Sequence, residues 1–116
     1  MIKDDGFIRN FSIKNEEGIH TSSLTILDIL KNRATETPNN IAYIYINDDM
    51  SSKKTLTYLD LYINATQIAK VIQKNTTKED RVLLLYPPGI EFISAFFGCL
   101  YANTIAVPAF PPKQNR

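Results

Sequence analysis

The sequence contains few residues of the kinds that form cross-links, metal centres and phosphate loops. Its 116 residues include one cysteine, Cys99, and one histidine, His20. A single cysteine excludes an internal disulfide, and His20 lies too far along the chain from Cys99 to begin a metal cluster. The 4 glycines are all isolated, so the chain has no glycine-rich phosphate loop. We therefore expect no disulfide, no metal site and no phosphate loop.

The sequence also has no excess of charge of one sign and no long apolar run. The 13 basic side chains nearly balance the 12 acidic ones, whereas proteins that bind nucleic acid or anionic membranes carry a basic excess. No run reaches the ~18–20 apolar residues of a membrane-spanning helix. Residues 1–10 contain acids and no apolar core, so they do not form a secretory signal. We expect a soluble, cytoplasmic protein with no nucleic-acid partner and no membrane span.

Apolar residues make up 44% of the sequence, which is the content of an ordinary globular protein. The length suits one domain or a piece of one. Residues 1–23 are polar and predict an irregular N-terminal arm, whereas residues 24–116 carry the periodic patterns. Thr25 and Asp28 form an acidic variant of the capping box, which predicts a helix that ends before Pro38.

Two further units follow this helix. The β-branched and aromatic run "IAYIYI", Ile41–Ile46, predicts a strand, and residues 47–54 form a polar, hairpin-like loop. Thr57 with Asp60 predicts a second helix start. The apolar residues of this helix recur at steps of four, three and four, which indicates one buried face. They are Leu61, Ala65, Ile68 and Ile72.

The last third of the chain predicts a strand, a helix and a strand. "RVLLLY", Arg81–Tyr86, is an unbroken apolar run that is typical of a strand covered on both faces. Ile90–Ala102 has the length of a helix and is apolar around most of its circumference. "TIAV", Thr104–Val107, predicts a strand that ends at Pro108. Such a βαβ unit over Arg81–Val107 should have parallel strands and a right-handed crossover, so we predict an α/β fold.

Two features of this unit have alternative interpretations. Pro87-Pro88-Gly89 lies beyond the carboxyl end of a predicted parallel strand, where open α/β sheets bind ligands. The same residues also suit a rigid strand-to-helix corner, which we favour. Phe92, Phe96 and Phe97 suit either the lining of a hydrophobic ligand tunnel or the core of the protein, and helical spacing favours the core.

The remaining polar and reactive residues do not form a catalytic constellation. Gly98 and Cys99 in mid-helix predict close helix packing, and an apolar setting should raise the pKa of the thiol and leave it unreactive. The acidic pairs Asp48-Asp49 and Glu16-Glu17 have no partner for acid–base work, and His20 has no triad companion. The residues alone indicate a soluble α/β domain.

The stretch "LLLYPPGIEFISAFFGCLYANTIAVPAFPPKQNR", Leu83–Arg116, resembles a signature of the fatty acyl-AMP ligases, a branch of the adenylate-forming superfamily. The upstream units "LTILDILKNRATETPNNIAYIYI" and "LTYLDLYINATQIAKVIQ" agree with it in order. The resemblance covers Leu24–Arg116, and the "YPPG" turn and "AVPAFPP" are typical of the branch. It implies that residues 24–116 are the opening, incomplete segment of a large N-terminal AMP-binding domain.

The resemblance also implies a two-step chemistry. A fatty acid carboxylate attacks the α-phosphate of ATP, assisted by Mg²⁺, and the resulting acyl-adenylate transfers its acyl group to an acyl carrier protein. The family's phosphate loop, adenine motifs, ribose-binding aspartate and catalytic lysine all have positions beyond Arg116, so no catalytic, cofactor-binding or metal-binding residue can be assigned here. We expect the chain alone to bind no cofactor and to be inactive. The residues expected to shape the substrate site from its base are Tyr86, Pro87, Pro88, Gly89, Pro108, Pro111 and Pro112.

Three hypotheses remain open at this point. The favoured one is an N-terminal fragment of a fatty acyl-AMP ligase, whose partner is the missing remainder of the enzyme. The second is a noncatalytic α/β binding module. The third is a structural subunit that a second chain completes. In isolation a buried helix such as Ile90–Ala102 would lack part of its cover, and exposed strand edges and apolar patches of that kind invite association.

Overall fold

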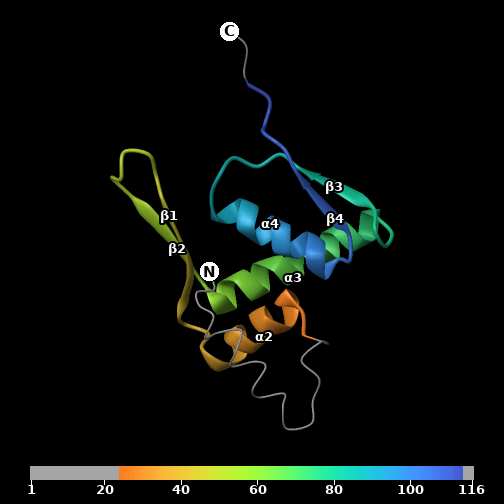
Figure 1. Cartoon of the computed structure of the whole chain (residues 1–116), viewed down its shortest axis with the longest axis horizontal. Coiled ribbons are helices and arrows are strands. Elements are labelled where there is room, and N and C mark those ends of the chain that lie inside the picture. Colours follow the sequence, from red (N-terminus) through yellow and green to blue (C-terminus); the bar gives the residue numbers. More distant parts are fainter. Residues whose placement is uncertain (1–23, 114–116) are drawn as a thin grey trace.

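The structure, a computed structural model, describes residues 24–113, so the predicted arm at residues 1–23 lies outside the described residues. Helix α3 crosses the middle of the molecule between α2 on one side and α4 on the other (Figure 1). The elements, in chain order, are α2 (Ile26–Glu36), β1 (Ile41–Ile46), β2 (Lys53–Thr57), α3 (Tyr58–Asn75), β3 (Arg81–Leu84), α4 (Ile90–Tyr101) and β4 (Ile105–Pro108). None of the helices within residues 24–113 is long and apolar enough to cross a membrane.

Both predicted helix starts are confirmed. At α2 the backbone N–H of Asp28 donates to Thr25 Oγ1 at 3.2 Å, and the backbone N–H of Thr25 donates to Asp28 Oδ2 at 2.9 Å. This reciprocal capping box satisfies two N–H groups that the first turn leaves without partners. At α3 the backbone N–H of Asp60 donates to Thr57 Oγ1 at 3.1 Å. These local hydrogen bonds place the two helix starts where the sequence predicted them.

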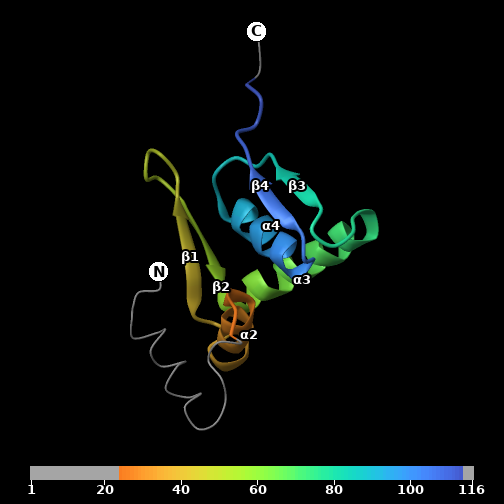
Figure 2. The same ribbon diagram turned by 45° about the vertical axis from the view of Figure 1, so that its right-hand side comes forward.

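Strands β1 and β2 form an antiparallel hairpin that extends away from the helices (Figures 1 and 2). The prediction of a loop over residues 47–54 was too long, because Lys53 and Lys54 belong to β2 and pair with Ile46 and Tyr45. The turn closes earlier, where the backbone N–H of Asn47 donates to the Ser52 carbonyl at 3.2 Å. Polarity suggested a loop, but lysines are well tolerated on an exposed edge strand.

Strands β3 and β4 are parallel neighbours joined through α4, which confirms the predicted βαβ unit. The register pairs Arg81 with Ile105 and Leu84 with Pro108. Strand β3 ends at Leu84, two residues before the predicted end, and β4 includes Pro108 as its last residue. Proline is accommodated there because a strand end needs no further N–H for the ladder. The right-handed crossover stays a prediction.

Only one face of this parallel pair is covered within residues 24–113, so the expectation of two covered faces was wrong for this chain. Val82, Leu84 and Ala106 pack toward α4 in a shared apolar cluster. On the opposite face Leu83 is 57% exposed and Ile105 is 46% exposed. Side chains alternate between the faces of a strand, and α4 supplies a layer on one face alone.

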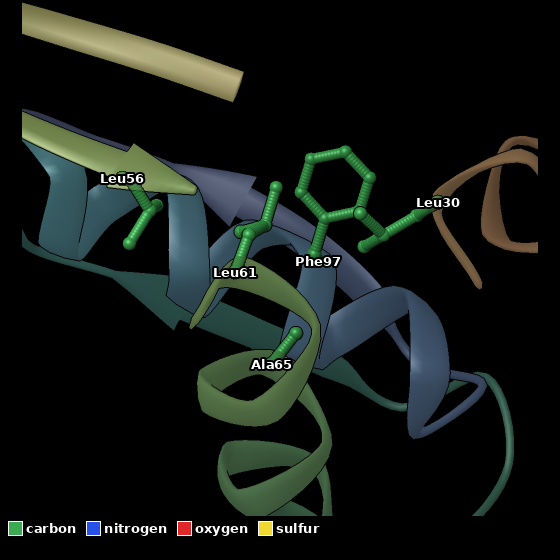
Figure 3. Packing of buried hydrophobic residues seen from close by; sticks show 5 residues of the cluster. All are labelled: Leu30, Leu56, Leu61, Ala65 and Phe97. Carbon is green, nitrogen blue, oxygen red and sulfur yellow. The ribbon is translucent and has the colours of Figure 1, made fainter. Parts of the chain in front are cut away.

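The helices bury two adjoining apolar clusters. The first joins α2, β2, α3 and α4, and its side chains point toward one another in Figure 3: Leu30, Leu56, Leu61, Ala65 and Phe97. The second joins Leu84 of β3 to Ala95 and Cys99 of α4, with Ile68 and Ile72 of α3 packed against it.

Gly98 allows α3 and α4 to pack closely. A Cβ at Gly98 would lie 2.9 Å from Ile68 Cβ and 3.2 Å from the Ala65 carbonyl oxygen. These distances are too short for a side chain of any size, which confirms the packing role predicted for this glycine.

Candidate functional site

The first predicted corner, Tyr86–Gly89, leads from the end of β3 into α4. Gly89 is the N-cap residue of α4, with φ 154° and ψ −178° and no side-chain capping hydrogen bond. This backbone region is essentially restricted to glycine, because a Cβ would clash with the backbone. The corner is therefore fixed by backbone geometry as well as by the two prolines before it.

The second predicted corner starts at Pro108, the last residue of β4. The backbone N–H of Ala109 donates to the Leu84 carbonyl at 3.1 Å, which extends the contact between the strands by one residue. Since Leu84 and Pro108 are paired in register, both corners leave the same end of the sheet. The chain then exposes Phe110 almost completely, at 94%. The structure thus brings the two corners to one rim, while their role in shaping a substrate site stays a prediction.

Of the three phenylalanines of α4, Phe97 is buried, and Phe92 and Phe96 are partly buried and pack against the apolar clusters. Phe97 is 6% exposed and lies in the first cluster, and Phe96 packs against both clusters. The rings of Phe96 and Phe97 meet edge to face with centroids 6.0 Å apart, a favourable aromatic geometry. Phe92 packs against the second cluster. These contacts favour the core interpretation over a ligand tunnel.

Cys99 is fully buried. Burial raises the pKa of its thiol, and a side-chain hydrogen bond with Thr104 opposes this rise to a smaller extent. The neutral thiol is a poor nucleophile, as predicted. Cys99 therefore acts as a small apolar core residue.

The acidic residues of the described part of the chain do not assemble into a metal-binding group. The carboxylate of Asp49 accepts the backbone N–H of Ser51 at 2.9 Å, and its hydrogen bonds with Ser51 lower the pKa of the carboxyl. It is a turn residue. Between residues 24 and 113 no group of three His, Cys, Asp or Glu side chains could hold a metal ion. His20 and Glu16-Glu17 lie outside the described residues.

A groove between α3 and α4 was not predicted from the sequence. It has a volume of about 340 Å³, and Tyr86 of the first corner is part of its lining. The polar residues Asn64, Gln67 and Ser94 also line it. On the sequence these residues are separate polar positions in two predicted helices. Only the packing of α3 against α4 brings them together.

Comparison with known proteins places this fold in a family. The family model described as "AMP-binding enzyme" matches residues 30–115. The medium-chain-fatty-acid–acyl-carrier-protein ligase JamA of Moorena producens (strain JHB) is 41% identical over 92 residues, which are 79% of this chain and 16% of that protein. Human disco-interacting protein 2 homolog B is 40% identical over 92 residues, which are 78% of this chain and 6% of that protein.

A solved structure agrees with these relatives. The fatty acyl-adenylate ligase from L. pneumophila, in complex with acyl adenylate and pyrophosphate, superposes with a TM-score of 0.71 and 40% identity, covering 76% of this chain and 15% of that one. The chain thus spans less than one fifth of the length of each of these proteins. It belongs to the AMP-binding enzyme family, and its mixed α/β fold is part of an N-terminal domain like that of the fatty acyl-AMP ligases.

Proposed function

We propose that the chain serves as the opening part of the AMP-binding domain of a fatty acyl-AMP ligase. The whole enzyme would join a fatty acid to ATP, releasing pyrophosphate and forming an acyl-adenylate. It would then pass the acyl group to an acyl carrier protein in the cytoplasm. The name of the JamA ligase, 41% identical over 92 residues, and the acyl-adenylate complex of the L. pneumophila enzyme support this reaction class.

The observation that carries the proposal is the arrangement of the two corners at one end of the β3–β4 sheet. Leu84 and Pro108 are paired, and Gly89 adopts a backbone conformation reserved for glycine. In open α/β folds the loops at the carboxyl ends of parallel strands build the ligand site. Prolines hold such loops at low entropic cost, because proline already restricts the unfolded chain. The corners would therefore position the base of the site, and residues supplied elsewhere would perform the chemistry.

The described residues do not fit ATP or Mg²⁺ by themselves. They contain no cluster of three metal-ligating side chains, and the whole sequence contains no glycine-rich phosphate loop. No reaction step is therefore assigned to a residue of this chain. We expect the 116-residue chain alone to show no ATP–pyrophosphate exchange with fatty acids. Robust exchange by the purified chain, abolished by a point substitution within it, would contradict this expectation.

A chimera tests whether the chain can serve as the opening part of the AMP-binding domain of such a ligase. The 92-residue segment of JamA that matches this chain would be replaced by the corresponding residues of this chain. We expect the chimera to catalyse ATP–pyrophosphate exchange that depends on a medium-chain fatty acid. Gly89→Val in the chimera should lower the yield of folded enzyme, because valine is strained at φ 154°. A well-folded chimera without any exchange would overturn the proposal.

One observation supports a second candidate, a noncatalytic binding module. The chain is 40% identical over 92 residues to human disco-interacting protein 2 homolog B, whose name describes an interaction and no ligase reaction. In that case a chimera with JamA would fold and remain inactive, while the isolated chain would still bind a protein partner.

A further inference from the structure

The groove between α3 and α4 is lined by polar side chains next to an apolar strip. Four of its residues lie at positions i, i+3, i+4 and i+7 of α3 and therefore share one face of that helix. Two more lie one helical turn apart on α4, and the last comes from the first corner. The lining residues are Asn64, Gln67, Ile68, Val71, Tyr86, Glu91 and Ser94.

Ser94 is the most unusual member of this lining. Its side chain is buried, with 5% of the residue exposed, and its hydroxyl has no hydrogen-bond partner among residues 24–113. The other buried hydroxyl of this region behaves differently, because Thr104 Oγ1 donates to the Cys99 carbonyl at 2.9 Å. A buried hydroxyl without a partner is costly, and native proteins rarely keep one without a reason. Ser94 thus points to a ligand that completes its hydrogen bonding.

The other groups define what such a ligand looks like. The exposed side-chain amides of Asn64 and Gln67 each offer donors and an acceptor, and neither makes a hydrogen bond within the described part of the chain. Val71 is 60% exposed and provides an apolar surface. Glu91 contributes a carboxylate. Among residues 24–113 it forms an ion pair with Lys54 at 3.9 Å, and because both side chains are mostly exposed, this pair is weak.

We propose that this groove binds an extended polypeptide segment that carries an aliphatic side chain next to a lysine or arginine. Side-chain amides pair well with the N–H and C=O groups of an extended main chain. The aliphatic side chain would lie on Ile68 and Val71, and the basic side chain would approach Glu91. A phosphate-bearing ligand is disfavoured, because the lining contains a carboxylate and no basic side chain. This inference does not depend on the proposed ligase function.

A displayed library of random seven-residue peptides, selected against the immobilised 116-residue chain, tests this site. We expect the enriched peptides to carry Lys or Arg beside Leu, Ile or Val. For the most enriched synthetic peptide, Ser94→Ala should weaken binding about three- to tenfold, as expected for one lost hydrogen bond. The double variant Asn64→Ala/Gln67→Ala should weaken it further. Glu36→Gln, at an exposed position of α2 outside the groove, should leave binding unchanged and serves as the control.

Thermal unfolding of the free chain separates a ligand-binding role from a structural one. Ser94→Ala should unfold at the same temperature as the unmodified chain or slightly above it, because the hydroxyl has no partner to lose. Thr104→Val, which removes the bonded hydroxyl, should unfold at a lower temperature and bind the peptide unchanged. A library without enriched sequences, or enriched peptides that bind the Ser94 and Asn64/Gln67 variants as tightly as the unmodified chain, would overturn the proposal. Marked destabilisation by Ser94→Ala would overturn it as well.

Discussion

Strand β1 is as apolar as strands β3 and β4, but the two strand pairs within residues 24–113 have very different surroundings. Strands β3 and β4 rest on α4, where Leu84 is 4% exposed. The β1–β2 hairpin extends away from the helices (Figure 2), and Ile41 and Ile44 in it are 51% and 52% exposed. The hairpin is anchored mainly at its base, where Leu56 joins the first cluster. A strand's apolar pattern therefore specifies that the strand needs cover, and another element must supply it.

This difference divides the described residues into a packed body and a partly covered periphery. The packed body consists of α2, α3, α4 and the inner face of β3–β4, which share the two apolar clusters. The periphery consists of the hairpin and the outer face of β3–β4. An isolated two-stranded hairpin is marginally stable in water, and parallel sheets are normally covered on both faces. We infer that the periphery contacts further parts of a larger domain, in agreement with the proposed function.

The largest effect should come from truncating a side chain in the packed body. Phe97→Ala should lower the free energy of unfolding by ~3–5 kcal/mol, the usual cost of removing a buried aromatic ring. The matched change in the periphery, Tyr43→Ala, removes a ring that is 40% exposed and should cost clearly less. Urea unfolding of both variants measures the difference. Equal losses would show that the division into body and periphery is wrong.

A smaller effect is expected from Gly98→Ala. The added Cβ would meet Ile68 and the Ala65 carbonyl at distances below ordinary contact, so α3 and α4 would have to separate. Overpacking of this kind typically costs ~1–3 kcal/mol, despite the higher helix propensity of alanine. A thermal melt in which Gly98→Ala is as stable as the unmodified chain would contradict the close approach of the helices.

The smallest effect is a loss of stability of the packed body at high pH. The hydroxyl of Tyr101 donates to the Leu27 carbonyl at 3.2 Å, and burial, followed by Tyr62 and Asp28, raises the pKa of its phenol to about 12. Between the pKa of an unfolded tyrosine, about 10, and this value, the unfolded chain binds fewer protons than the folded one. Stability should therefore fall as the pH rises through this window.

Unfolding measured at pH 9 and pH 11.5 tests this dependence. Tyr101→Phe should reduce the loss between the two values, at the expense of one hydrogen bond at neutral pH. Tyr86→Phe, which removes a more exposed phenol, is the control. An identical loss in the Tyr101→Phe variant and the unmodified chain would mean that this phenol does not carry the effect.

The features that were predictable from the sequence are those set by neighbouring residues. The capping pairs Thr25–Asp28 and Thr57–Asp60 place two helix starts, and the proline and glycine at residues 88 and 89 separate β3 from α4. The parallel pairing of β3 with β4 follows from the connection between them, which is long enough to contain a helix. The exposure of Leu83 could not be predicted, because it depends on how many layers pack against the sheet.

The candidate site was predictable in part for the same reason. Both proline corners follow strand ends, so their common rim follows from parallel pairing. The groove with Ser94 depends on the contact of α3 with α4, which is made by residues far apart in sequence. The Gly98 contact with Ile68 has the same origin: the glycine indicated close packing, while its partner was visible only in the fold.

Hydrogen exchange of the backbone amides, measured in the isolated chain and in the JamA chimera, tests the central claim most directly. The claim is that this chain is a packed body whose periphery is completed by the rest of an AMP-binding domain. We predict that amides of α3 and α4 are protected in both proteins, whereas amides of β1 and β2 exchange rapidly in the isolated chain and become protected in the chimera. Equal protection of the hairpin in the two proteins would contradict the claim.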